Sequence, residues 1–89
     1  MKVYQVSKKM FFLSNGTDYA SAVDMVDDVK IFTGFKKAEK EFNELVGSYA
    51  AVYRREPKVV NHIGNVYWST EIKNYDRRIV IEFSAKEVC

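Results

Sequence analysis

Hydrophobic and polar residues recur with two different periods along this chain, and each period predicts a different kind of element. Between Phe35 and Tyr53, apolar residues return every three or four positions, which aligns them along one side of a helix. Lysine and glutamate fill the intervening positions, several of them four residues apart, where opposite charges stabilise a helix. Thr33 is placed to cap the start of this helix, and Arg54 and Arg55 suit the negative end of its dipole.

The length of this helix depends on one glycine. Gly47 lies inside the periodic segment, where glycine costs about 1 kcal/mol relative to alanine and favours an earlier end. The apolar stripe nevertheless continues through Val52 and Tyr53. We therefore predict the longer helix, which Pro57 ends.

The second pattern has a period of two and predicts a β-hairpin. Apolar and polar residues alternate over Val66–Lys73 and again over Arg78–Phe83, on either side of a turn at Tyr75 and Asp76. Folding the chain at this turn pairs Ile72 with Ile79, Thr70 with Ile81 and Trp68 with Phe83. One face of the hairpin is then apolar, and the other carries Tyr67, Glu71, Val80 and Glu82.

The N-terminal part predicts two more strands. Lys2–Ser7 forms a strand that can extend to Phe12, and Asp28–Thr33 forms another that leads directly into the helix. Residues 19–27 either continue this hairpin or form a short helical turn. The order β-β-α-β-β predicts an α+β fold, in which one long helix covers one face of an antiparallel four-stranded sheet.

Composition fits one domain spanning residues 1–89. A chain this short cannot bury two cores, and 47% hydrophobic residues with a net charge of +2 are not typical of a disordered chain. The only cysteine is Cys89, so no internal disulfide forms. We find no apolar run of the ~20 residues that a membrane span needs, and no signal peptide. We expect a cytoplasmic protein that does not enter membranes.

Catalytic and metal-binding patterns are missing from the sequence. One histidine, His62, and one terminal cysteine, Cys89, cannot supply the three or four fixed ligands that zinc needs. Asp24, Asp27 and Asp28 lack the glycine turn and distal glutamate of a calcium loop. Phosphate-binding and dinucleotide-binding glycine motifs do not occur. We therefore expect no enzymatic activity, no cofactor and no metal.

Two surfaces are candidates for binding another protein. One helix covers only one side of the predicted sheet, so the other side is exposed and mixes aromatic with charged residues, as partner-binding surfaces do. Its predicted members are Tyr67, Glu71, Val80 and Glu82. The acidic residues Asp24, Asp27 and Asp28 lie in a stretch without lysine or arginine, which could mimic nucleic-acid phosphates toward a basic groove. The leading hypothesis is a non-enzymatic protein-binding module.

A nucleic-acid-binding protein is the alternative. Lys73, Arg77 and Arg78 flank Tyr75 at the hairpin tip, where Lys73 faces Arg78 across the strands. Like charges placed opposite each other are destabilising, and a bound phosphate, with Tyr75 stacked on a base, would offset that cost. A hairpin tip is well solvated, however, and Asp76 supplies a local counter-charge, so we favour protein binding.

Two segments resemble small phage- and mobile-element-encoded proteins, among them anti-CRISPR and other anti-defence inhibitors. These segments are the strand and helix at Val29–Phe42 and the hairpin formed by Tyr67–Ile72 and Arg78–Phe83. The resemblance implies an inhibitor that acts by binding a host protein, with no functional residue carried over.

Self-association is expected to be weak. Stacking two copies on their open faces would bury Glu71 and Glu82, and an unpaired buried charge costs several kcal/mol. Pairing through a sheet edge is the other route to a dimer. We predict a monomer or a weak homodimer.

Overall fold

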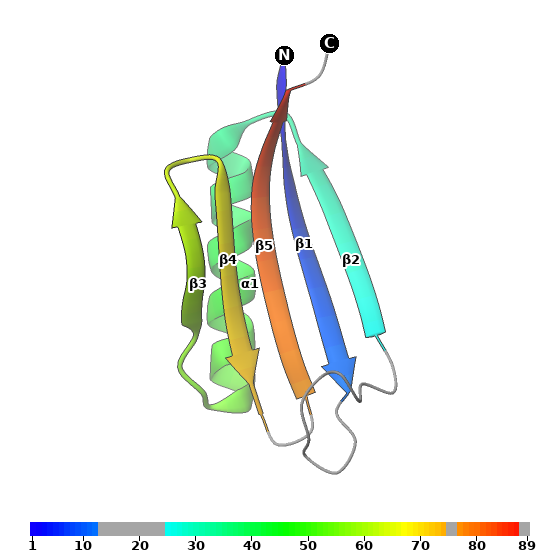
Figure 1. Ribbon diagram of the computed structural model, residues 1–89, viewed down its shortest axis with the longest axis vertical. Coiled ribbons are helices and arrows are strands. Elements are labelled where there is room, and N and C mark those ends of the chain that lie inside the picture. Colours follow the sequence, from blue (N-terminus) through cyan, green and yellow to red (C-terminus); the bar gives the residue numbers. More distant parts are fainter. Residues whose placement is uncertain (13–24, 75–76, 88–89) are drawn as a thin grey trace.

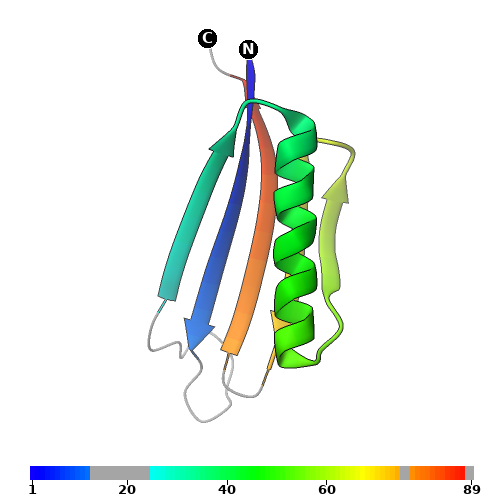
Figure 2. The same ribbon diagram turned by 180° about the vertical axis from the view of Figure 1, so that it is seen from behind.

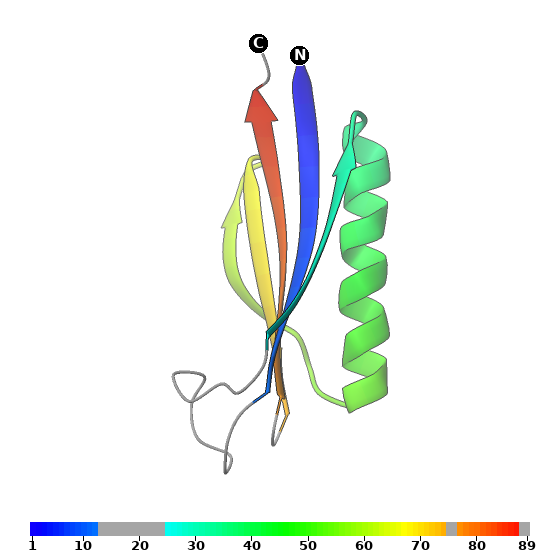
Figure 3. The ribbon, with the colours of Figure 1, turned by 90° about the vertical axis from the view of Figure 1, so that its right-hand side faces the viewer.

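The computed structural model describes residues 1–12, 25–74 and 77–87, which form one sheet and one helix. The sheet is antiparallel throughout and has the strand order β2-β1-β5-β4-β3 (Figure 1). The helix lies on one face of this sheet and forms a second layer (Figure 3). In chain order, the elements are β1 (Lys2–Phe12), β2 (Met25–Phe32), α1 (Phe35–Tyr53), β3 (Lys58–Ile63), β4 (Tyr67–Lys73) and β5 (Arg77–Glu87).

The predicted α+β class is confirmed, but the predicted number of strands is wrong. The sheet has a fifth strand, β3, which the sequence pattern did not indicate. All six residues of β3 are exposed, so no buried face imposes a period of two on them. A β-bulge between Val59 and Asn61 breaks the remaining alternation, because it adds one residue to the strand.

The first and last strands lie side by side in the middle of the sheet. β1 and β5 have 11 residues each and pair along their whole length, from Lys2 opposite Glu87 to Phe12 opposite Arg77. The prediction that the first strand extends to Phe12 is confirmed. β2 begins earlier than predicted, so residues 25–27 are strand, whereas residues 19–24 lie outside the described residues.

The helix runs through Gly47 to Tyr53, as predicted, but both of its ends differ from the prediction. Thr33 does not cap the start, because Gly34 is the capping residue and makes no side-chain hydrogen bond. At the other end, Arg54 adopts a left-handed conformation with φ of 53°, and its backbone N–H contacts the last helical carbonyls. The helix therefore ends before Pro57 is reached.

The core lies between α1 and the inner face of β1, β4 and β5. Its largest fully buried side chains are Phe83, Ile72, Ile79, Ile81 and Val6. The predicted hairpin register is confirmed, with Trp68 opposite Phe83, Thr70 opposite Ile81 and Ile72 opposite Ile79. Trp68 stacks on Phe83 with ring centroids 4.1 Å apart, and Phe35 and Phe42 of α1 pack edge-on against Trp68. Alternation along the strands thus directs one apolar face onto the helix.

Candidate functional site

The face of the sheet opposite α1, here called the open face, brings together four residues predicted to share a surface. Glu71 lies directly opposite Val80, Glu82 lies two residues further along β5, and Tyr67 lies four residues before Glu71 on β4. All four are partly buried rather than fully exposed. The hairpin register thus places Tyr67, Glu71, Val80 and Glu82 side by side.

Charges on the open face are already paired within the chain. The Tyr67 hydroxyl donates a hydrogen bond of 2.6 Å to Glu82 Oε2, and the Lys9 ammonium lies 3.9 Å from Glu82 Oε1. This hydrogen bond, together with partial burial, raises the pKa of Tyr67, because a phenolate would lie against the Glu82 carboxylate. Two of the predicted partner-binding side chains therefore bind each other.

Arg78 forms the second charge pair of the open face. Its Nε donates a hydrogen bond of 2.6 Å to Glu71 Oε2, and the two side chains are only 19% and 21% exposed. The guanidinium also lies 5.4 Å from the centre of the Phe11 ring. The repulsion predicted between Lys73 and Arg78, which do face each other, is thus offset by Glu71.

The other residues proposed for nucleic-acid binding are less well defined. Lys73 is exposed and Arg77 is partly buried, whereas Tyr75 and Asp76 lie outside the described residues. Binding of nucleic acid at this tip remains a prediction.

Asp28 does not join the open face. Asp28 pairs with Lys8, whose side chain contacts Tyr49 of α1, so Asp28 lies on the helix side of the sheet. Asp27 is the neighbouring residue of β2 and lies opposite Lys9, whereas Asp24 lies outside the described residues. Asp28 and the open-face residues therefore belong to two surfaces.

The outer edge of β3, here called the β3 edge, is a candidate that the sequence did not reveal. β3 pairs with β4 on one side and forms one border of the sheet. Three large apolar side chains of this strand are exposed: Val59, Val60 and Ile63. The opposite border of the sheet, β2, alternates the exposed charged residues Asp28 and Lys30 with the exposed apolar residues Val29 and Ile31. The two borders thus differ in charge, because β3 has no charged residue after Lys58.

A groove of about 360 Å³ separates β3 from α1. Phe42 and Val46 of α1 form one wall, β3 forms the other, and Trp68 and Thr70 of β4 line it from below. Figure 2 shows β3 at the side of α1 rather than beneath it.

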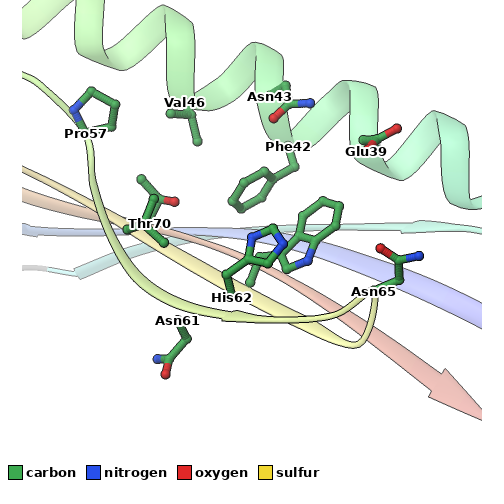
Figure 4. Close-up of a pocket in the computed structure, with 11 residues that line it drawn as sticks. Glu39, Phe42, Asn43, Val46, Pro57, Asn61, His62, Asn65 and Thr70 are labelled. Atoms are coloured by element: carbon green, nitrogen blue, oxygen red, sulfur yellow. The ribbon is translucent and has the colours of Figure 1, made fainter.

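The bulge in β3 determines which side chains reach this groove. Val59 lies opposite Thr70 and His62 lies opposite Trp68, and both partners point toward the helix side. Residues three apart on a regular strand point to opposite faces, so the extra residue lets Val59 and His62 share one face. Figure 4 shows His62 pointing toward Phe42, whereas Asn61 points away. The His62 ring stacks nearly parallel on Trp68, with centroids 5.3 Å apart.

Two features are absent from the described part of the chain, a metal-binding cluster and a membrane-spanning helix. No group of three or more histidine, cysteine, aspartate or glutamate side chains there could hold a metal ion. Over the same residues, α1 is too polar to cross a membrane. Comparisons with family models, curated proteins and solved structures find no significant match to this chain. Function is therefore inferred from the chain's own geometry.

Proposed function

We propose that this chain is a non-enzymatic protein-binding module and that it binds an extended segment of another protein at the β3 edge. The observation that carries this proposal is the composition of that edge. From Val59 to Ile63 the border strand has no charged side chain, and every residue in it is exposed.

An apolar border strand is a template for strand addition. Backbone N–H and C=O groups on the outer side of an edge strand can pair with an extended segment, and exposed side chains then set specificity. Proteins usually protect such edges with charges, as β2 does with Asp28 and Lys30. β3 has a single charged residue, Lys58, at its very start. Its edge is therefore the less protected of the two.

The adjacent groove supplements the edge. A bulge interrupts β3 near Val60, so the regular part of the edge is short and its backbone pairing alone would bind weakly. The groove volume of about 360 Å³ is at the lower end of the range for binding pockets, which suits one or two side chains of a partner. Backbone pairing and side-chain insertion together support a protein segment as the ligand.

Two valines of equal exposure on opposite borders provide a matched test. Val60 of β3 is 51% exposed and Val29 of β2 is 52% exposed. A ribosome-displayed library of random twelve-residue peptides would be selected on the wild-type protein, and selected peptides would be titrated against Val60→Lys and Val29→Lys. We expect Val60→Lys to lower affinity at least tenfold, whereas Val29→Lys binds like the wild type.

The opposite results would contradict the proposal. Failure to enrich any peptide, or equal binding by the wild type and Val60→Lys, would exclude the β3 edge as a binding surface. A third variant, Val80→Asp, tests the open face. If it alone abolished peptide binding, the open face would be the interface and the β3 edge would not.

A further inference from the structure

We infer that the segment bound at the β3 edge runs antiparallel to β3 and carries, in order, a basic residue, a bulky apolar residue and an acidic residue. This inference rests on the proposed function and specifies the partner. It follows from the charges at the two ends of the groove and from the apolar walls between them.

One end of the groove is acidic. Glu39 is the only charged residue among those that line it, and its side chain is 36% exposed. Lys36 approaches the Glu39 carboxylate at 3.8 Å, but this lysine side chain is 89% exposed, so water screens the pair. Figure 4 shows Glu39 and Asn65 together at this end. A basic side chain of a partner would meet a carboxylate here.

The opposite end is basic. Pro57 lines the groove there, and Figure 4 places it at the far end from Glu39. Arg54, Arg55 and Lys58 surround this proline in the chain, against a single acid, Glu56, and all of these residues are exposed. An acidic side chain of a partner is therefore favoured at this end.

The direction of the partner follows from the strand. β3 runs from Lys58 at the basic end to Ile63 near the acidic end. Every strand pair described in this sheet is antiparallel, and antiparallel pairing is slightly more stable per residue than parallel pairing. An antiparallel segment enters at Glu39 and leaves at Lys58. Its basic residue therefore precedes its acidic residue.

Between these ends the groove accepts an apolar side chain. Phe42 and Val46 face Val59 across it, and Trp68 lies below, so most of its walls are aromatic or aliphatic. Side chains of an added strand alternate between the two sides of the sheet. Those on the helix side, level with Val59 and His62, lie beside this groove. A leucine, phenylalanine or tryptophan in such a position would be removed from water.

A second copy of this chain fits the site less well than a segment of another protein. An antiparallel copy would also place its acidic end against the basic end, so charge alone does not exclude it. A stable dimer buries about 1,200 Å² or more, however, and six strand residues span only about 20 Å. The bulges of both copies would also lie against each other and interrupt the pairing. A single extended segment can bind within the β3 edge and the groove alone, without the larger buried area that a stable dimer requires.

Charge reversal tests the predicted order. The tightest selected peptide would be resynthesised with its basic residue replaced by glutamate and its acidic residue by lysine. The wild type should bind the original peptide at least tenfold more tightly than the reversed peptide. The double variant Glu39→Lys/Lys58→Glu should show the opposite preference and bind the reversed peptide more tightly. An unchanged preference in this double variant would overturn the inference.

A matched pair of helix variants tests the groove. Asn43→Trp places a large ring at the groove wall, whereas Lys40→Trp places the same ring elsewhere on the exposed side of α1. We expect Asn43→Trp to weaken peptide binding at least tenfold and Lys40→Trp to leave it unchanged. Equal binding by both variants would overturn the role of the groove.

These variants distinguish an error in the inferred partner from an error in the proposed function. If Val60→Lys abolishes binding while charge reversal and Asn43→Trp have no effect, the β3 edge binds segments but the inferred partner is wrong. If Val60→Lys has no effect, the proposed function itself is wrong. Light scattering of the wild type and Val60→Lys tests whether a second copy of the chain occupies the β3 edge. If the wild type is a dimer and Val60→Lys is a monomer, the second copy is the occupant and the inferred partner is wrong.

Discussion

The ammonium group of Lys8 on β1 donates a hydrogen bond of 2.8 Å to the phenolic oxygen of Tyr49 on α1. This contact joins the sheet to the helix across a partly buried space, and the ammonium also lies 5.2 Å from the centre of the Tyr49 ring. The hydrogen bond raises the pKa of Lys8 by more than partial burial lowers it. Lys8 thus stabilises the two-layer packing while it remains protonated.

Alkaline pH should destabilise the fold through two groups. The pKa values of Lys8 and Tyr67 are both raised on folding, so each contributes stability that is fully present below about pH 10 and is lost as pH rises through the folded-state pKa. We expect the free energy of unfolding to fall above pH 10. Urea denaturation at pH 7 to 11.5 measures this, and Tyr67→Phe should show a shallower fall than the wild type. An identical fall in Tyr67→Phe would contradict the assignment.

The Glu71–Arg78 pair should contribute far more stability than an exposed pair on the helix. Glu71→Gln removes the carboxylate from a guanidinium that is four-fifths buried, at a cost of about 2 kcal/mol. Lys40 and Glu44 lie 4.0 Å apart with well-exposed side chains, so Glu44→Gln should change stability by less than about 0.5 kcal/mol. Urea denaturation of both variants checks this difference, and equal losses would refute it.

Gly47→Ala should stabilise the protein. Gly47 lies inside α1, and a methyl group added there meets no atom within 4 Å, so alanine gains helix propensity of about 0.5 to 1 kcal/mol without a clash. Gly64 is the control, because its φ of 46° favours glycine and Gly64→Ala should cost about 1 kcal/mol. Thermal unfolding should therefore shift in opposite directions for the two variants. A lower melting temperature for Gly47→Ala would contradict the expectation.

The helix and the hairpin could be predicted from the sequence because each buries one continuous apolar face. Phe42 and Ala38 on α1 and Ile72, Ile79 and Ile81 on the hairpin are all buried, and burial is what imposes a regular hydrophobic period. The open-face group followed from the same hairpin register. The hydrogen bonds from Tyr67 to Glu82 and from Arg78 to Glu71 could not be predicted from that register. The hydrophobic period shows which face a side chain occupies, but not which neighbour it contacts.

The β3 edge and its groove could not be predicted in this way. An exposed strand that contains a bulge carries no period, and the groove depends on the spacing between β3 and α1, which only the tertiary structure sets. The two adjacent valines, Val59 and Val60, just after Pro57 were the available signal. An apolar pair beside a proline is compatible with a loop as well as with an edge strand.

Nucleic acid should bind weakly to the wild-type protein. Arg78, one of the residues proposed for phosphate contact, is hydrogen-bonded to Glu71. Glu71→Gln removes this competing carboxylate, so we expect it to raise affinity for a labelled single-stranded oligonucleotide at low salt. The measurement is binding as a function of salt, where a real phosphate contact gives a slope of roughly one unit per neutralised phosphate. Tight, salt-dependent binding by the wild type would favour the nucleic-acid hypothesis instead.

Self-association should be weak, because the open face is poorly suited to pairing with a second copy. Stacking two open faces would bring the Tyr67–Glu82 and Glu71–Arg78 pairs of both copies into a dry layer, where desolvating four charge-bearing pairs costs more than their contacts return. The β3 edge avoids this cost but offers only six residues. Light scattering in reductant, which prevents a disulfide through Cys89, should therefore give a monomer at micromolar concentration. A dimer that persists at nanomolar concentration and is lost in Val80→Asp would show that the open face is the protein's own interface.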